Sequence, residues 1–577
     1  MRSRCLAVLI LAACCAVADT PAWVAQSNRN AQVLLEIMAR YSPESAGQYG
    51  VSGLDEQIFD IKPNSKERQK RETVAAGKIL ATRLKSEKDP LVRQDLQILI
   101  DSARDDVRGF ELREKYYIPY FSVFRSIYNG IQALLADQVA AGRRPAALVR
   151  LRRYTGGENG FTPVTVLAER RIREKLNKPG LLSPAKIEVE KDLENTQFFV
   201  DGIGQLFEKY KIERYKDSYA KLKEQLAAYD AFLRKDVLPK SRSDFRLPRE
   251  LYDFSLTQFG VDIPAAELTD MAHTAFSQIQ AEMQTVAAKV AGEKGWSKTD
   301  YRDVIRELKK NQLVGEEILP YYQKRIASIE EIVRREHLVS LPNRPSRMHL
   351  ASVAETASQP APHMKPPPLI GNTGESGEFV LTLNIPGPAG GLRYDDFSFE
   401  AASWTLTSHE ARPGHEMQFA AMVENGVSQA RGIFAFNSTN VEGWGLYSEY
   451  IMRPFMPLDG QLISLQHRLL RAARAYLDPE LHMGKISPEQ ARQVLLEDVV
   501  VSEAMANQEV ERYTFRSPGQ ATSYFYGFTR LSQLRSDVEK AMGSKFNQQK
   551  FHDFILAQGL LPPALLRKTV FEDFVKQ

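Results

Sequence analysis

The chain has 577 residues, of which 43% are hydrophobic and 26% charged, and its formal net charge is +4. This composition is typical of a folded protein that is long enough to bury a large core. Positive and negative residues are interspersed, and no basic block with interleaved aromatic residues occurs, which argues against a nucleic-acid partner.

The N-terminal segment MRSRCLAVLILAACCAVADTPAW has the features of a secretory signal. Two arginines precede a stretch of apolar or small residues at 5–18, which is too short to span a bilayer. The letters AVA predict a signal peptide of residues 1–18, cleaved before Asp19. The letters LAAC resemble a bacterial lipobox, which predicts cleavage before Cys14 and a lipid on that cysteine. Both alternatives predict export to the periplasm or cell envelope, with membrane attachment only through the N-terminal lipid.

All three cysteines lie in this leader. The mature chain is therefore predicted to have no disulfide and no thiol nucleophile. Any transition metal must then be bound through histidine and carboxylate side chains.

Residues 19–577 are predicted to form a single large all-α domain, with two helical halves around a deep active-site cleft. From about residue 28 to 340, apolar residues recur at steps of three and four. Residues 341–395 are rich in Pro, Gly and Ser and interrupt this pattern. Within them, EFVLTLNIP alternates in polarity and predicts one small β element near 378–386. An extended substrate could pair with such a strand, which makes Asn384 a candidate substrate-binding residue.

The stretch TSHEARPGHEMQ, residues 407–418, is similar to the zinc-protease motif H-E-x-x-H with a longer spacing. His409 and His415 are six residues apart, which on a regular helix places them roughly 240° apart. Pro413 and Gly414 lie between them, and a bulge there could absorb about two residues and return His415 to the face of His409. The alternative is that Pro413 and Gly414 end one helix and His415 begins another element.

A third metal ligand is predicted in NSTNVEGWGLYSEYIM, which begins at residue 437. With Asn440 as N-cap, Glu442 falls in the first turn of a helix and points away from a core stripe. Two glycines follow Glu442 within one turn, although each costs about 1 kcal/mol in a helix. The close approach of another backbone or of a ligand would explain both. Glu449, two turns later, is the reserve ligand.

Four motifs in this order, HEARPGH, VEGWGLYSE, ERYTFRSPGQATSYFYG and FHDFILAQGLLP, resemble the bacterial family called domain of unknown function 885. The resemblance covers most of the mature chain. It implies a helical zinc peptidase of the broad group that contains angiotensin-converting enzyme, carboxypeptidase Taq and dipeptidyl-peptidase III. By position it implies one Zn²⁺ per chain, with His409, His415 and Glu442 as ligands and Glu410 as the base. Glu416 replaces a frequent histidine of the family and could compete for metal.

The ligand set implies hydrolysis of peptide bonds by a metal-bound water that Glu410 activates. Tyr524 is the favoured second donor to the oxyanion, and His482 is a weaker catalytic candidate. Arg516 and Gln520 are candidate substrate-binding residues, because both lie in or beside the third motif. Two alternatives stay open, namely a metal-free, inactive peptide-binding envelope lipoprotein and a metal-dependent hydrolase of another amide or ester.

Overall fold

The computed structural model describes residues 21–385 and 391–576, and it is mainly helical with a small β component. The predicted fold class is confirmed. The signal peptide and both predicted cleavage sites lie outside the described residues. No helix within the described ranges combines the length and apolar character that a bilayer crossing needs.

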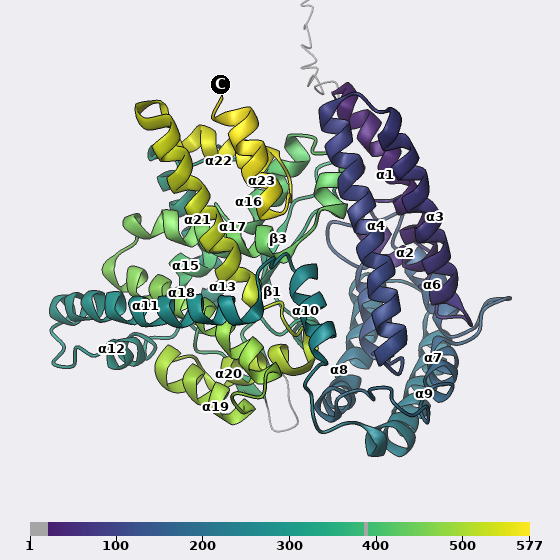
Figure 1. Cartoon of the computed structure of the whole chain (residues 1–577). Helices are drawn as coiled ribbons and strands as arrows, with labels where there is room; N and C mark the ends of the chain where they lie inside the picture. The colour runs from purple at the N-terminus through teal and green to yellow at the C-terminus, as the bar shows by residue number, and fades with distance from the viewer. Residues whose placement is uncertain (1–20, 386–390, 577) are drawn as a thin grey trace, which may run out of the picture.

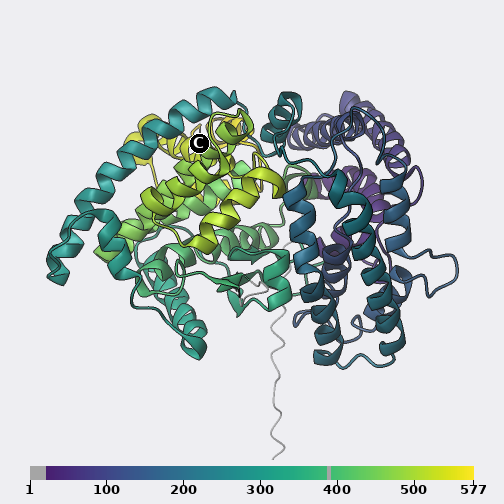
Figure 2. The same cartoon turned by 90° about the horizontal axis from the view of Figure 1, so that it is seen from below.

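The N-terminal half consists of helices α1 to α9, coloured purple to blue in Figures 1 and 2. Asp89 accepts hydrogen bonds from the backbone amides of Leu91 and Val92 and so caps the longest of them, which has proline at its first position. The helices are α1 (Ala22–Tyr41), α2 (Pro43–Gln48), α3 (Ser65–Ser86), α4 (Pro90–Tyr116), α5 (Val123–Gln132), α6 (Ala146–Tyr154), α7 (Val164–Arg173), α8 (Lys186–Lys209) and α9 (Lys216–Phe232).

The C-terminal half packs α11 against α18, α15 against α18, and α17 against α21. Its helices are α10 (Arg249–Gln258), α11 (Ala265–Lys294), α12 (Tyr301–Leu308), α13 (Ile318–Arg335), α14 (Val353–Ser358), α15 (Glu400–Glu410), α16 (His415–Glu424), α17 (Ser438–Met452), α18 (Leu458–His482), α19 (Pro488–Val494), α20 (Glu503–Glu511), α21 (Thr522–Met542), α22 (Gln548–Ala557) and α23 (Pro563–Thr569). Much of α18 is buried on all sides, so it forms the centre of this half.

The two halves share apolar cores. Ala354 and Ala357 of α14 belong to the core of the N-terminal half, together with Phe124 and Tyr128. In the other direction, Ile98 of α4 packs in the same core as residues of α17 and α21. Burial across the boundary therefore joins the halves.

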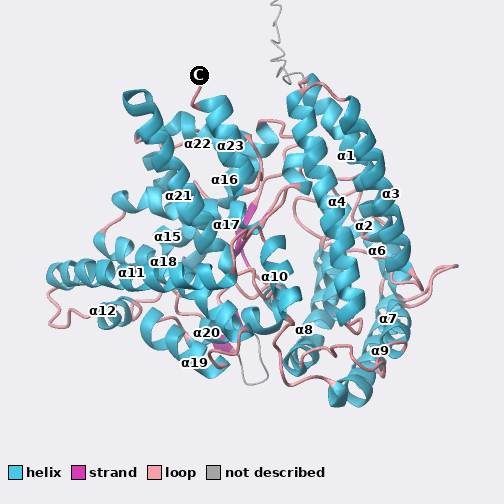
Figure 3. Ribbon diagram, in the orientation of Figure 1, coloured by secondary structure: helices cyan, strands magenta, loops and turns pink. Residues whose placement is uncertain are grey.

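The β structure is more extensive than predicted. β3 (Glu378–Leu381) pairs in parallel with β1 (Arg347–Leu350) and antiparallel with β2 (His363–Lys365), so it is the central strand of three. Figure 3 shows how small the strand content is beside the helices. A separate two-stranded sheet joins β4 (Asn384–Ile385) to β5 (Leu392–Arg393). The predicted β element near 378–386 is confirmed, as β3 and β4, while β1, β2 and β5 were not predicted. Because β3 is flanked on both sides, its backbone is not available to pair with a substrate.

A cavity of about 1420 Å³ lies between the halves. Its walls come from α3, the end of α4 and the following loop, α10, and the segments around Phe436 and Phe515. Neither His409 nor Glu442 is among its lining residues. Two of its lining residues are, however, close in sequence to residues of the motifs. Phe436 is two residues before Ser438, and Pro518 is two residues before Gln520.

Candidate metal centre

The two motif histidines lie on separate helices. α15 ends at Glu410, residues 411–414 are not helical, and α16 begins at His415. Of the two alternatives, the structure contains the helix end followed by a new helix from His415, and not a bulge within one helix. A Cβ at Gly414 would lie 1.9 Å from the carbonyl oxygen of His409, so only glycine fits this tight connection. The connection nevertheless brings the imidazole of His415 back beside that of His409, with ring centroids 4.6 Å apart.

The carbonyl oxygen of Pro413 anchors this connection to α17. It accepts hydrogen bonds from Trp444 Nε1 at 2.9 Å and from Ser448 Oγ at 3.2 Å. All three groups are buried. The helix that carries Glu442 thus also fixes the position of the turn between the two histidines.

Glu442 comes from the second turn of α17. Asn437 caps this helix, because its side chain accepts a hydrogen bond from the amide of Asn440 at 2.8 Å. The predicted N-cap at Asn440 is wrong by three residues. The predicted core stripe of this helix is correct, since Trp444, Tyr447 and Ile451 are all buried.

The two glycines after Glu442 have different steric reasons. A Cβ at Gly443 would lie 2.6 Å from the backbone carbon of Gly527, where α17 crosses α21. A Cβ at Gly445 would lie 2.7 Å from Cε1 of His409 and 2.8 Å from Cε1 of His415. Both contacts are closer than van der Waals separation. Gly443 therefore permits helix packing, and Gly445 makes room for the two imidazoles.

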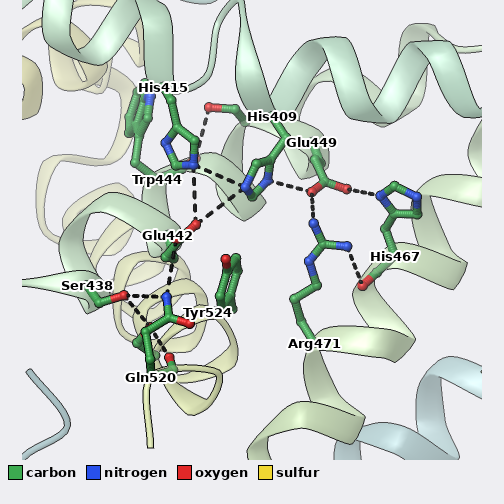
Figure 4. A network of polar contacts seen from close by, with 12 residues as sticks. His409, His415, Ser438, Glu442, Trp444, Glu449, His467, Arg471, Gln520 and Tyr524 are labelled. Atoms are coloured by element: carbon green, nitrogen blue, oxygen red, sulfur yellow. Dashed lines mark hydrogen bonds and ion pairs between the residues drawn. The ribbon is translucent and has the colours of Figure 1, made fainter. Parts of the chain in front are cut away.

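The three predicted ligand atoms form a compact triangle (Figure 4). His415 Nε2 lies 3.1 Å from His409 Nε2 and 3.2 Å from Glu442 Oε2, and His409 Nε2 lies 3.5 Å from Glu442 Oε2. With bonds of about 2.05 Å, two ligands of a tetrahedral zinc ion are about 3.3 Å apart. The donor set of two imidazole nitrogens and one carboxylate oxygen, with these separations, fits a zinc ion.

Neighbouring side chains orient two of the three predicted ligands. Glu449 Oε1 lies 2.8 Å from His409 Nδ1, and its other oxygen accepts a hydrogen bond from Thr405. A carboxylate can only accept, so Nδ1 of His409 carries the proton and Nε2 presents its lone pair to a metal. Gln520 Nε2 lies 3.4 Å from the other carboxylate oxygen of Glu442.

The other two candidate carboxylates for the metal do not join the triangle. Glu449 faces the opposite nitrogen of His409, so it orients a ligand. Glu416 is fully buried and pairs with Arg412, its Oε2 lying 2.7 Å from Nε. Glu442 is thus the carboxylate that the structure brings to both histidines.

Burial and local charge move the pKa values of these carboxyl groups in opposite directions. Burial alone would raise the pKa of Glu449, but Arg471 and His409 outweigh it and hold the pKa at about 2. Burial likewise opposes ionisation of Glu442, yet hydrogen bonds to both histidines lower its pKa well below the usual value. Burial raises the pKa of Glu410 to about 8. Adjacent carboxyl groups therefore have separate roles: two stay ionised, and Glu410 can exchange a proton near neutral pH.

A small cavity of about 50 Å³ adjoins this centre, and His409, Glu410 and Tyr524 line it. The ring of Tyr524 is stacked on that of His409 with centroids 6.1 Å apart. Tyr524 is buried, and burial raises its pKa. The structure thus brings Tyr524 to the centre as a protonated hydrogen-bond donor.

Three of the predicted site residues lie elsewhere. His482 Nδ1 accepts from the amide of Leu247 at 3.2 Å, while its Nε2 lies 2.9 Å from the carbonyl of Tyr513. Burial lowers its pKa to about 4, so this histidine is neutral and structural. Arg516 pairs with Glu511 at 2.9 Å, and Asn384 is exposed on β4. None of the three lines the small cavity. Gln520 contacts a predicted ligand, as described above.

Sequence reasoning missed a polar stripe on α18. His467, Arg471, Arg474 and Asp478 are buried at relative positions 0, 4, 7 and 11, so they share one face of the helix. The first three line the small cavity. Ionisable residues at this spacing, with apolar residues beside them in the sequence, are a detectable signal, because charged residues are rarely buried without a partner or a function.

Comparisons with other proteins place the chain in a family and a fold. The sequence model of the family described as "Bacterial protein of unknown function (DUF885)" matches residues 43–570. A comparison with curated proteins gave no significant match.

Two solved structures share the fold. One, from Colwellia psychrerythraea, is provisionally described as a lipoprotein; it is 19% identical, with a TM-score of 0.76 over 95% of this chain and 99% of that chain. The other, from Shewanella oneidensis, is provisionally described as a lipoprotein of unknown function. It is 18% identical, with a TM-score of 0.68 over 96% of this chain and all of that chain.

Proposed function

We propose a zinc-dependent peptidase function for this chain, which belongs to the bacterial family DUF885. The observation that carries the proposal is the triangle of His409 Nε2, His415 Nε2 and Glu442 Oε2, with separations of 3.1, 3.2 and 3.5 Å. Two imidazoles and one carboxylate are the protein ligands of catalytic zinc sites that keep one position for water. Glu410, which precedes α16 and lines the adjoining cavity, supplies the base.

When bound, zinc would supply a Lewis acid that lowers the pKa of a water molecule toward neutrality and polarises a substrate carbonyl. The residues of the chain then have separate tasks. Glu410 accepts a proton from the attacking water and passes it to the leaving amine. A divalent cation beside it favours its ionised form and so offsets the effect of burial on its pKa.

Tyr524 is the proposed donor to the oxyanion. Its hydroxyl lies 3.4 Å from Arg512 Nη1, and three arginines surround its ring at 4.5 to 5.9 Å. Positive charge on this side of the ring makes the hydroxyl a stronger donor to a developing negative charge. Glu449 holds the imidazole of His409 in the tautomer that a metal requires.

We also propose that the protein is exported to the cell envelope. The leader supports this location, and the two proteins of the same fold are provisionally described as lipoproteins. The proposed lipid attachment at Cys14 is tested by mass spectrometry of the native N-terminus. A mature chain that begins at Asp19 would favour the signal peptide of residues 1–18, without a lipid on Cys14. A chain that begins at Met1 would contradict export.

The decisive experiment compares Glu410→Gln with Glu416→Gln. Glutamine keeps the packing of Glu410 but cannot accept a proton, so we expect zinc binding to remain and peptide hydrolysis to fall at least roughly 100-fold. Glu416→Gln changes a neighbouring buried carboxylate that pairs with Arg412, and it should matter much less. Full activity of the Glu410 variant would place the base elsewhere. A wild-type protein that binds no zinc would support the inactive, peptide-binding alternative.

A further inference from the structure

The small cavity beside Glu410 contains an unusual concentration of arginine. Arg471 and Arg474 of α18 and Arg512, which follows α20, line it together with Tyr524. Arg471 and Arg474 are buried, and the side chain of Arg512 is 13% exposed. Three guanidinium groups so close together in a protein interior require compensation, because burying an unpaired charge is costly.

The neighbouring carboxylates compensate only two of these charges. Glu509 binds Arg474 through two contacts of 2.7 Å, and Arg512 approaches the same carboxylate only to 3.8 Å. Burial would raise the pKa of Glu509, but the two arginines hold it at about 2. Glu449 lies 3.5 Å from Arg471 but makes its shorter contact with His409. Three cations therefore share two carboxylates.

The other acidic residues that line the cavity do not supply the missing charge. Asp396 is paired with Lys309 at 2.6 Å and accepts from Ser502. Among the described residues, no ion pair joins Glu410 to an arginine. In the part of the chain that the structure describes, the three arginines therefore have only Glu449 and Glu509 as ion-pair partners.

Two of the arginines also keep unused hydrogen-bond donors. Nε of Arg471 is buried and has no hydrogen-bond partner among the described residues. Arg512 makes a long contact of 3.4 Å to the hydroxyl of Tyr524 besides its distant ion pair. Arg474, in contrast, forms a bidentate pair with Glu509 through Nε and Nη2. The free donors are therefore those of Arg471 and Arg512, on the side of the cavity that Tyr524 shares.

We propose that this cavity binds a carboxylate on the leaving-group side of the peptide substrate, through Arg512 and Arg471. The proposal rests on the peptidase function proposed above and narrows its substrate class. The carboxylate supplies the missing negative charge and accepts from the unused donors. Peptides with a free C-terminus carry such a group close to the last peptide bond, which makes the enzyme a carboxypeptidase.

The dimensions of the cavity agree with this assignment. A cavity needs a volume of roughly 10–15 Å³ to hold one water molecule. The small cavity, at about 50 Å³, therefore has room for a group of a few atoms and not for a folded chain. The N-terminal ammonium group of a peptide would lie beside three arginines in this cavity, and repulsion between like charges disfavours its binding there.

The test pairs a change in the substrate with a change in the enzyme. N-acetylated peptide pools are prepared with a free or an amidated C-terminus, and cleavage is followed by mass spectrometry. The wild-type enzyme should cleave the free acids at least roughly 100-fold faster, by removal of C-terminal residues. Arg512→Gln should lose most of that advantage, through a raised KM for the free acids. Because Arg512 also contacts the hydroxyl of Tyr524, the readout is the ratio of free-acid to amide cleavage within each variant, in which a change in catalysis common to both substrates cancels.

Arg516→Gln is the matched control, because Arg516 lies four residues away, pairs with Glu511 and does not line the cavity. It should retain the full preference for free acids. Amidated peptides that each contain one Glu distinguish the source of the carboxylate. If only those are cleaved, an acidic side chain occupies the cavity. Equal cleavage of free and amidated pools regardless of Glu, or equal effects of the two variants, would overturn the proposal.

A binding measurement tests the cavity even if hydrolysis is absent. Calorimetric titration of the Glu410→Gln protein with acetyl-tetraalanine, as the free acid and as the amide, compares the two ends without turnover. Tighter binding of the acid that Arg512→Gln abolishes supports the carboxylate site. If the acid binds no more tightly than the amide, the proposal is wrong. Absence of cleavage in all peptide pools would count against the peptidase function instead.

Discussion

Replacing Gly445 with alanine should remove zinc binding without unfolding the protein. The added Cβ would lie 2.7 Å from His409 Cε1, 2.9 Å from His409 Nε2 and 2.8 Å from His415 Cε1. Carbon atoms in contact are normally about 3.5–4.0 Å apart, so the rings must move by roughly 0.8 Å. Zinc–ligand distances tolerate about 0.2 Å. We expect the affinity for zinc to fall at least roughly 100-fold.

The cost to the fold should be small. Alanine is favoured over glycine in a helix by about 1 kcal/mol, whereas overpacking costs about 1–3 kcal/mol, so the free energy of unfolding should change by at most about 2 kcal/mol. Zinc affinity is measured by competition with a chelator, and stability by denaturant unfolding of the metal-free protein. Zinc should stabilise the wild type by mass action and should not stabilise the variant.

Two further glycine substitutions serve as controls. Gly443→Ala places a Cβ 2.6 Å from the backbone of Gly527, so it should weaken the crossing of α17 and α21 and lower stability. Gly292→Ala in α11 has open space around its Cβ and should be neutral or slightly stabilising. Unchanged zinc affinity in a folded Gly445→Ala protein would refute the assignment of the two histidines as joint ligands.

Two of the remaining predictions concern the surroundings of the metal centre, and a third concerns the stability of the fold at low pH. Glu449→Gln should weaken zinc binding roughly 10- to 100-fold, because a neutral amide holds His409 less firmly, and chelator competition measures this. Gln520→Ala should leave one oxygen of Glu442 without its 3.4 Å contact and should weaken zinc binding less than Glu449→Gln does in the same assay. Burial lowers the pKa of both His482 and His552 from 6.5 to about 4, so the unfolded chain binds protons first on acidification. Each histidine therefore contributes roughly 3 kcal/mol to the free energy of unfolding above pH 6.5, and this contribution is lost as the pH falls to 4. Urea unfolding at several pH values should show this slope, and it should flatten when either histidine is replaced by glutamine.

The proposed ligand set was accessible from sequence because its signals are local. His409, Glu410 and His415 lie within seven residues, and the glycines after Glu442 indicated a close approach that the structure contains. The path between the histidines was not accessible. The same residues are compatible with a bulge within one helix and with a break between two helices. Which of the two forms depends on the tertiary contacts of Pro413 with α17.

The other features were harder to predict from the sequence, because they depend on contacts between residues that are distant in the chain. β1 and β3 pair in parallel although about 30 residues separate them, and short strands of this kind carry little sequence signal. His482 was a candidate only because histidine is a common catalytic residue. Its two backbone partners are distant in sequence, at Leu247 and Tyr513. The stripe on α18 was visible as a pattern, but its meaning depends on Glu449 and Glu509 from other helices.

X-ray absorption at the zinc edge of the zinc-loaded protein is the most direct test of the metal centre. We expect one zinc per chain with four nitrogen or oxygen ligands at about 2.0–2.2 Å, including scattering from two imidazoles. His415→Ala should lose zinc or retain the signature of only one imidazole. Zinc bound by oxygen alone, or an unchanged spectrum and stoichiometry in His415→Ala, would contradict a centre formed by His409, His415 and Glu442.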